Sequence, residues 1–226
     1  MIEGGTGYDL ENKLPYEIEH CYPDYGLYPE QTKNIAYGFL ARGCPRDCPF
    51  CIVSQKEGKR SIKVADLSEF WREQKIIKLL DPNLLACKDH VELLQQLINS
   101  KSYVDFTQGL DARYINEENA KLLAKIKVKM IHFAFDDIRQ EKSIVKGLKL
   151  FKKTCNVAEN KTGVYILTNY NTTHQQDLYR VKVVQELGYR PYIMIYNKKS
   201  APKITKDLQR WSNNRRIYYG TDKLFA

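Results

Sequence analysis

The amino-acid sequence predicts an α/β fold in which parallel strands form an open, partial (β/α)6 barrel. Short runs rich in β-branched and aromatic residues recur at fairly even intervals, and amphipathic helical patterns lie between them. The runs are mostly apolar rather than alternating, which is typical of parallel strands buried on both faces. Strands that alternate with helices form right-handed βαβ units, and the number of units is too small for a closed eight-fold barrel.

The expected elements follow in chain order. Asn116 and Thr173 are candidate helix starts, and Gly188 is a candidate helix stop. The strands are expected at residues 36–41, 76–80, 103–107, 130–135, 163–167 and 192–196. The helices, each with apolar residues three and four positions apart, are expected at residues 67–74, 90–100, 117–125, 141–153 and 175–187.

Three segments are expected from these patterns. Residues 1–35 do not fit the strand–helix alternation, because they are acidic and rich in Tyr, Pro and Gly, and they predict an extended lead-in. Residues 36–200 predict the partial barrel, and residues 201–226 predict a basic C-terminal extension. Polar residues follow each strand, and the carboxyl ends of parallel strands are where such folds place their active sites.

Composition indicates a soluble globular protein. The chain has 226 residues, of which 43% are hydrophobic and 28% charged. No run approaches the roughly 18 apolar residues that a membrane span needs, and the start has no secretory pattern. We therefore expect a cytoplasmic protein without membrane contact. The net charge of +9 is uneven, since residues 172–226 carry eleven Lys and Arg against four acidic residues. This region suits a phosphate-rich partner or is simply a solvated surface.

A cluster of cysteines carries the strongest chemical signal. Cys44, Cys48 and Cys51 form a C-x3-C-x2-C pattern directly after the first expected strand. Such clustering in a chain without an export signal indicates metal binding or redox chemistry rather than disulfides. Three thiolates this close can each ligate one iron of a cubane cluster, which leaves the fourth iron without a protein ligand. Cys21, Cys87 and Cys155 are scattered and are interpreted as ordinary thiols.

Zinc is the alternative for this cluster. Structural zinc sites prefer one pair of cysteines with a second pair downstream. The sequence has no second pair, because Cys87 and Cys155 stand alone. A zinc-stabilised, basic nucleic-acid-binding module without catalysis is therefore the second hypothesis.

The cysteine motif resembles that of the radical S-adenosylmethionine (SAM) superfamily. The resemblance rests on the cysteine spacing, its place after the first strand, Phe50 before the last cysteine, and the flanking residues 39–45. It covers roughly residues 36–200. It implies an oxygen-sensitive enzyme with a partial barrel, in which Cys44, Cys48 and Cys51 hold a [4Fe–4S] cluster. Such an enzyme cleaves SAM reductively to begin radical chemistry, and its electron donor is a protein such as flavodoxin or ferredoxin.

The resemblance also assigns cofactor-binding roles. Phe50 and Ile52 lie in the segment that resembles the family's adenine contact, and Asn169 follows the fifth strand near the same region. Asp81 and Asn83 stand where the family usually has a Gly-Gly-Glu-like motif that receives the methionyl amine. This chain lacks those glycines, and a turn that ends a strand explains these residues equally well.

Further candidates follow the third and fourth strands. Arg113 is expected to pair with the carboxylate of SAM, and Gln108 or Asp111 to bind ribose hydroxyls or substrate. The competing interpretation is a buried Asp–Arg pair that fixes this loop. Asp136 and Asp137 either bind substrate or cap the following helix.

The substrate is left open among a nucleic acid, a peptide and a small metabolite, and no catalytic residue is assigned. Trp211, Tyr218 and Tyr219 lie among arginines in the basic region and would suit nucleic acid. His132 lies within an expected strand and is interpreted as a packing residue. Residues 3–8, followed by residues 14–15 and 23–25, resemble the junction in radical SAM proteins that carry an upstream cobalamin-binding-type domain, which is here largely absent. The alternative is an accidental likeness.

Overall fold

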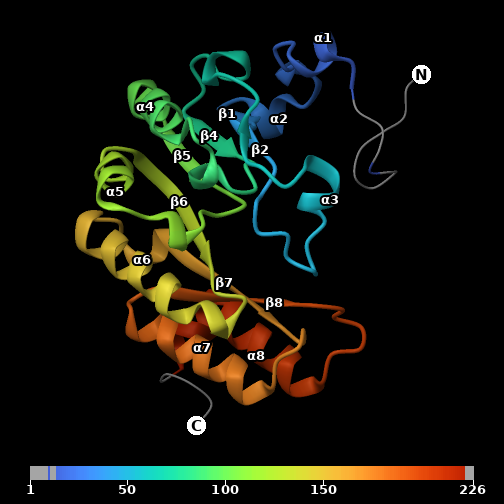
Figure 1. Ribbon diagram of the computed structural model, residues 1–226, viewed down its shortest axis with the longest axis vertical. Coiled ribbons are helices and arrows are strands. Elements are labelled where there is room, and N and C mark those ends of the chain that lie inside the picture. Colours follow the sequence, from blue (N-terminus) through green and yellow to red (C-terminus); the bar gives the residue numbers. More distant parts are fainter. Residues whose placement is uncertain (1–9, 11–13, 222–226) are drawn as a thin grey trace.

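Figure 1 shows the computed structural model of the chain, which describes residues 10 and 14–221. The amino-terminal motif at residues 3–8 lies outside this range. Six parallel strands form one sheet in the order β1-β4-β5-β6-β7-β8. β1 and β8 are the edges of this sheet. The α/β class and the parallel strands are thereby confirmed, and the open sheet is compatible with a partial barrel. The strands span Ile35–Gly38, Ile76–Leu79, Tyr103–Phe106, Lys127–Ala134, Thr162–Thr168 and Arg190–Ile195.

Helices cover one face of the sheet (Figure 1). α7 packs against β7 and β8, and α8 packs against β8. Alternate strand residues face this layer, so Ile77, Val104, Phe133 and Ile166 are completely buried. The main helices are α4 His90–Ser100, α5 Glu117–Leu123, α6 Glu141–Thr154, α7 His174–Glu186 and α8 Lys203–Asn213.

Helix boundaries follow the capping residues that the sequence indicates. The side chains of Asn116 and Thr173 accept hydrogen bonds from the amides of Asn119 and Gln176, and each completes a capping box. Gly188 follows α7 with a φ of +73°, a conformation that favours glycine at a helix end. Four of the five expected helices are thus confirmed within two residues at each end.

The helix expected at residues 67–74 is wrong. Only a 3-10 turn, Leu67–Glu69, forms there. Beyond it the indole of Trp71 donates to the carbonyl of Gln74, and the Gln74 side chain accepts from the amide of Arg72. These local side-chain bonds replace the helical ladder.

The first expected strand, residues 36–41, is divided. β1 ends at Gly38, and the chain then forms β2, Ala41–Arg42, which pairs antiparallel with β3, Ile62–Lys63. A Cβ at Gly38 would lie 2.4 Å from the ring of Phe70, so the backbone passes close to that ring. β2 carries the chain directly into the cysteine motif.

Within the described residues, both terminal regions contain short helices. The lead-in contains α1, Tyr16–Glu19, and α2, Pro29–Thr32, and the Tyr25 hydroxyl anchors it by accepting from the amide of Tyr37 and donating to the carbonyl of Phe70. Beyond residue 200, α8 is followed by α9, Arg215–Gly220. Within the described range, none of the helices combines the length and apolar character needed to span a bilayer. The remaining short elements are α3 Val53–Glu57 and the 3-10 turns Tyr25–Leu27, Leu84–Ala86, Ala112–Tyr114, Ile138–Gln140 and Glu159–Lys161.

Candidate functional site

The cysteine motif lies in the loop between β2 and α3, on the side of the sheet away from α4, α5 and α6 (Figure 1). Gly43 enters this loop with a φ of +85°, and a Cβ there would lie 2.0 Å from the carbonyl oxygen of Arg60. The amide of Cys44 donates to the carbonyl of Gly58, and the amide of Cys51 donates to that of Cys48. Backbone contacts that only glycine permits therefore shape the loop.

The three thiols of the loop are free. Cys44 and Cys48 are half-buried and Cys51 is exposed. Burial raises the pKa of Cys48, and the negative charges of Cys44 and Cys51 raise this pKa further. The sulfurs are thus close enough to act on one another electrostatically.

The described residues do not form a ready-made site for a single metal ion. Among residues 14–221, no three Cys, His, Asp or Glu side chains are grouped to share one metal ion. In a four-iron cluster each thiolate binds its own iron, so the sulfurs do not have to converge on one point. The three cysteines lie in one loop, and none of them is fully buried.

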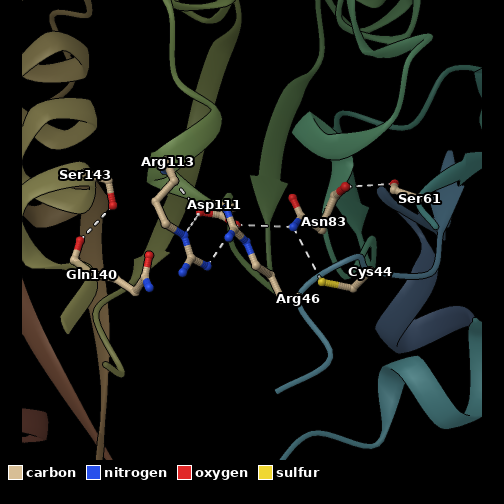
Figure 2. Close-up of polar contacts among 8 residues, drawn as sticks. All are labelled: Cys44, Arg46, Ser61, Asn83, Asp111, Arg113, Gln140 and Ser143. Carbon is tan, nitrogen blue, oxygen red and sulfur yellow. Dashed lines mark hydrogen bonds and ion pairs between the residues drawn. The ribbon is translucent and has the colours of Figure 1, made fainter. Parts of the chain in front are cut away.

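Asn83 lies beside the first cysteine (Figure 2). Its side chain is almost completely buried, and its Nδ2 lies 3.5 Å from Cys44 Sγ and 3.4 Å from Asp111 Oδ2. Its backbone carbonyl accepts from the hydroxyl of Ser61. Its Oδ1 is buried without a hydrogen-bond partner among the described residues. Because an unpaired buried acceptor is costly, this oxygen is suited to a ligand that donates a hydrogen bond.

Asp111 joins the cysteine loop to the end of β5 (Figure 2). Its carboxylate accepts from Arg113 Nε at 2.7 Å and from Arg46 Nε, within the cysteine loop, at 2.9 Å. Burial raises the pKa of Asp111, but the hydrogen bond and charge of Arg113 and the charge of Arg46 outweigh it and hold the pKa below its ordinary value. The Asp–Arg pair that the sequence suggested as the competing interpretation is therefore present.

Asp81 is directed at the backbone. It is almost completely buried, and its carboxylate accepts from the amide of Leu40 at 3.1 Å and from that of Ala41 at 2.5 Å. Burial raises the pKa of Asp81 to about 7. The side chain thus fixes the start of β2, three residues before Cys44. A role for Asp81 in binding SAM stays a prediction.

The remaining predicted residues lie along the same edge of the sheet. The ring of Phe50 lies 5.3 Å from that of Tyr170, edge to face, which brings the cysteine loop against the end of β7. Asn169, at a φ of +60°, donates through Nδ2 to the carbonyl of Tyr196 and so joins the ends of β7 and β8. Ile52 and Gln108 are exposed.

Arg180, which is not among the residues predicted from the sequence, organises the ends of β6 and β7. This completely buried side chain donates to the carbonyls of Phe135, Asp136 and Leu167 and pairs with Asp177 at 2.6 Å. No sequence signal identifies it, because an arginine on an amphipathic helix is normally exposed.

The two aspartates after β6 have separate roles. The Asp136 carboxylate accepts from the amide of Leu167 at 2.8 Å, and burial raises its pKa. Its negative charge also raises the pKa of Cys48, which places it near the cysteine loop. Asp137 instead caps the next 3-10 turn by accepting from the amide of Arg139, as the capping interpretation expected.

Comparison with known proteins gives one distant similarity and no family assignment. No protein-family model matches the chain. The chain is 24% identical over 174 residues to the anaerobic magnesium-protoporphyrin IX monomethyl ester cyclase of Cereibacter sphaeroides. The alignment covers 67% of this chain and 27% of the cyclase, so the chain spans about a quarter of that relative's length. The cyclase is an enzyme of the radical SAM type, and the similarity gives a coarse suggestion of that class and of enzymatic activity.

Proposed function

We propose that the chain is a radical SAM enzyme in which Cys44, Cys48 and Cys51 hold a [4Fe–4S] cluster. The observation that carries the proposal is the cysteine loop itself, placed at the carboxyl edge of an open parallel sheet with the unpaired Asn83 Oδ1 beside Cys44. A reduced cluster of this kind supplies the electron that cleaves SAM. The distant similarity to the cyclase supports the same class.

The protein's own residues would bind and orient the cofactor. Asn83 Oδ1 would accept a hydrogen bond from the methionyl amine, which is a multiple donor. Arg113 would approach the methionyl carboxylate, although its Nε and one terminal nitrogen already donate to Asp111. Phe50, held against Tyr170, would contact adenine.

The substrate and partners are further proposals. The cyclase, by its name, acts on a porphyrin ester, but this chain covers only 27% of it, and its substrate is not carried over. A nucleic acid, a peptide and a small metabolite all stand as substrate classes, with a flavodoxin-like or ferredoxin-like electron donor. Trp211, one of the aromatic residues considered for nucleic-acid stacking, is buried and packs against Tyr218, so it does not offer an open ring.

Iron content tests the cluster assignment. The full chain is reconstituted anaerobically with iron and sulfide, and iron per chain and the visible absorption spectrum are measured. Cys48→Ala is expected to lose the cluster, whereas Cys21→Ala, which changes an exposed cysteine outside the loop, is expected to keep it. Equal iron in the two variants contradicts the proposal. A colourless protein with one zinc per chain supports the zinc-stabilised module instead.

A further inference from the structure

The sheet face opposite the helices carries an organised set of side chains. Lys78, Asp105 and Met130 lie side by side across β4, β5 and β6, and Tyr165 and Tyr192 lie side by side across β7 and β8. Because strand side chains alternate, these residues point away from the helices that bury their neighbours. None of the five is fully buried. We call these residues, together with His132, the open sheet face.

Two rings at the centre of this face are fixed in place. The imidazole of His132 stacks on the ring of Tyr165, with centroids 4.5 Å apart and planes 9° apart. Gly163 lies beside His132 across the strand pair, and a Cβ there would lie 2.9 Å from the imidazole. The hydroxyl of Tyr165 donates to the carbonyl of Thr107 at 3.0 Å. The stacked pair is therefore held from both sides.

A further aromatic surface remains open beside the pair. The ring of Tyr192 meets that of Tyr165 edge to face at 5.5 Å, and its side chain is 39% exposed. Met194, two residues along the same strand, is 47% exposed. Exposed aromatic and thioether groups next to fixed rings form a surface on which a planar ligand can stack.

Several polar atoms around the rings have no hydrogen-bond partner among the described residues. Within the described residues, the buried atoms His132 Nδ1 and Thr107 Oγ1 have no hydrogen-bond partner. The carboxylate of Asp105 and the ammonium group of Lys78 form no hydrogen bond or ion pair with any described residue, although the two residues are neighbours across β4 and β5. Lys78 has only the ring of Tyr37, 5.5 Å away. A ligand that covers this face must donate a hydrogen bond to the carboxylate of Asp105 and place a negative charge beside the ammonium group of Lys78.

From this arrangement we infer that the open sheet face binds a planar heteroaromatic acid. Its ring would stack on Tyr192 and so meet the His132–Tyr165 pair edge to face, as Tyr192 itself does. A ring N–H would donate to Asp105, and its acidic group would pair with Lys78. The face lies next to the edge at which the cysteine loop meets the ends of β5 and β6, where Cys48 interacts with Arg113 and Asp136. That the ligand is the substrate of the radical chemistry rests on the proposed function.

Binding is tested by calorimetry with the purified full chain and without SAM. Guanosine 5′-monophosphate and tryptophan are the two probes, because each combines a planar ring, a ring N–H and an acidic group from a different source. Ribose 5-phosphate lacks the ring, and guanosine and indole lack the acidic group. At least one probe is expected to bind at one site per chain and about tenfold more tightly than its acid-free counterpart.

Matched variants locate the site. Tyr192→Leu and Asp105→Asn are each expected to weaken binding about tenfold. Tyr179→Leu on α7, which changes a tyrosine that is 45% exposed, and Asp207→Asn on α8 are expected to leave binding unchanged. Absence of binding by both probes, equal affinity for ribose 5-phosphate, or equal effects of the two tyrosine variants would overturn the inference.

The outcome is separable from that of the proposed function. Production of 5′-deoxyadenosine from SAM by the reconstituted protein is measured without either probe. Binding that depends on Tyr192 in a protein that never cleaves SAM supports the ligand site and contradicts the radical SAM proposal. SAM cleavage in a protein that binds neither probe does the reverse.

Discussion

At the scale of single residues, the site combines satisfied and unsatisfied polar groups. Asp111 accepts from two arginines, whereas Asn83 Oδ1, on the neighbouring loop, is buried without a partner among the described residues. A hydrogen-bond network in which every group has a partner fixes a loop. A buried acceptor without a partner is a point where a ligand that donates a hydrogen bond would gain binding free energy. Removing the Asn83 side chain therefore tests whether this acceptor binds the cofactor, although it also removes the Nδ2 contacts to Cys44 and Asp111.

The first prediction concerns Asn83. Asn83→Ala is expected to weaken SAM binding to the reconstituted protein about tenfold or more, because a hydrogen bond to a charged group contributes about 1.5–3 kcal/mol. Titration calorimetry measures the affinity. Asn99→Ala serves as the control, because among the described residues the Asn99 side chain on α4 bonds only to Gln95. Unchanged affinity in the Asn83 variant would remove this residue from the cofactor site.

The second prediction concerns Arg180. Arg180→Met is expected to lower the free energy of unfolding by about 3–5 kcal/mol, because it leaves Asp177 buried and unpaired. Lys182→Met, on the same helix, is expected to change it by less than about 1 kcal/mol, because Lys182 and Glu186 are both largely exposed. Urea unfolding followed by circular dichroism compares the two. Similar midpoints would show that the Arg180 network does not hold β6 and β7 together.

At the scale of elements, the short β2 strand determines where the cysteine loop starts. Asp81 binds the amides of Leu40 and Ala41, and Gly43 then turns the chain under the carbonyl of Arg60. The loop is thus held at its entrance by a buried carboxyl group and by a backbone conformation that only glycine adopts easily. Each of these can be tested separately.

The third prediction compares two glycines. Gly43 and Gly58 both have a positive φ, but a Cβ at Gly43 would overlap the backbone of Arg60, whereas a Cβ at Gly58 would have no atom within 4 Å. Gly58→Ala is expected to cost about 1–3 kcal/mol from backbone strain alone. Gly43→Ala is expected to cost more and to lower iron per chain after reconstitution. Equal melting temperatures and equal iron contents would contradict the role given to Gly43.

The fourth prediction concerns pH. The pKa of Asp81 is raised to about 7 in the folded chain from an ordinary value of 3.8. Between these values the folded chain keeps a proton that the unfolded chain has released, so the contribution of Asp81 to stability falls as the pH rises from about 4 to about 7. Asp81→Asn is expected to flatten this part of the profile, because the amide oxygen still accepts from the backbone. Urea unfolding at several pH values measures it, and parallel profiles for the two proteins would contradict it.

Most of the helices and strands could be predicted from the sequence, for a physical reason. The apolar pattern of a buried parallel strand or an amphipathic helix is contained within a short stretch of sequence. The six sheet strands and four helices could therefore be predicted from the sequence. The break between β1 and β2 was not, because it depends on Asp81, which lies 40 residues further along the chain. The clustered cysteines were visible for the same local reason. The unpaired oxygen of Asn83 and the burial of Arg180 depend on tertiary packing, so no local sequence pattern predicts them.

At the scale of the whole molecule, the sheet divides the chain into two sides. The helices bury one face, and the cysteine loop and the open sheet face lie on the other (Figure 1). Basic residues of the carboxyl-terminal region lie on α8 and α9. α8 packs against β8, and α9 packs against α8, so this region continues the fold at the β8 edge and is not a separate arm. The proposed chemistry and its proposed ligand thus share one side of one sheet.

We propose that this chain cleaves SAM with a cluster held by its cysteine loop. The most direct measurement is the amount of 5′-deoxyadenosine formed after anaerobic reconstitution, reduction with dithionite and addition of SAM. We expect 5′-deoxyadenosine from the unaltered chain and from Cys21→Ala, and none above background from Cys44→Ala, Cys48→Ala or Cys51→Ala. No 5′-deoxyadenosine from a chain that carries its full complement of iron, or equal amounts from the loop variants, would contradict it.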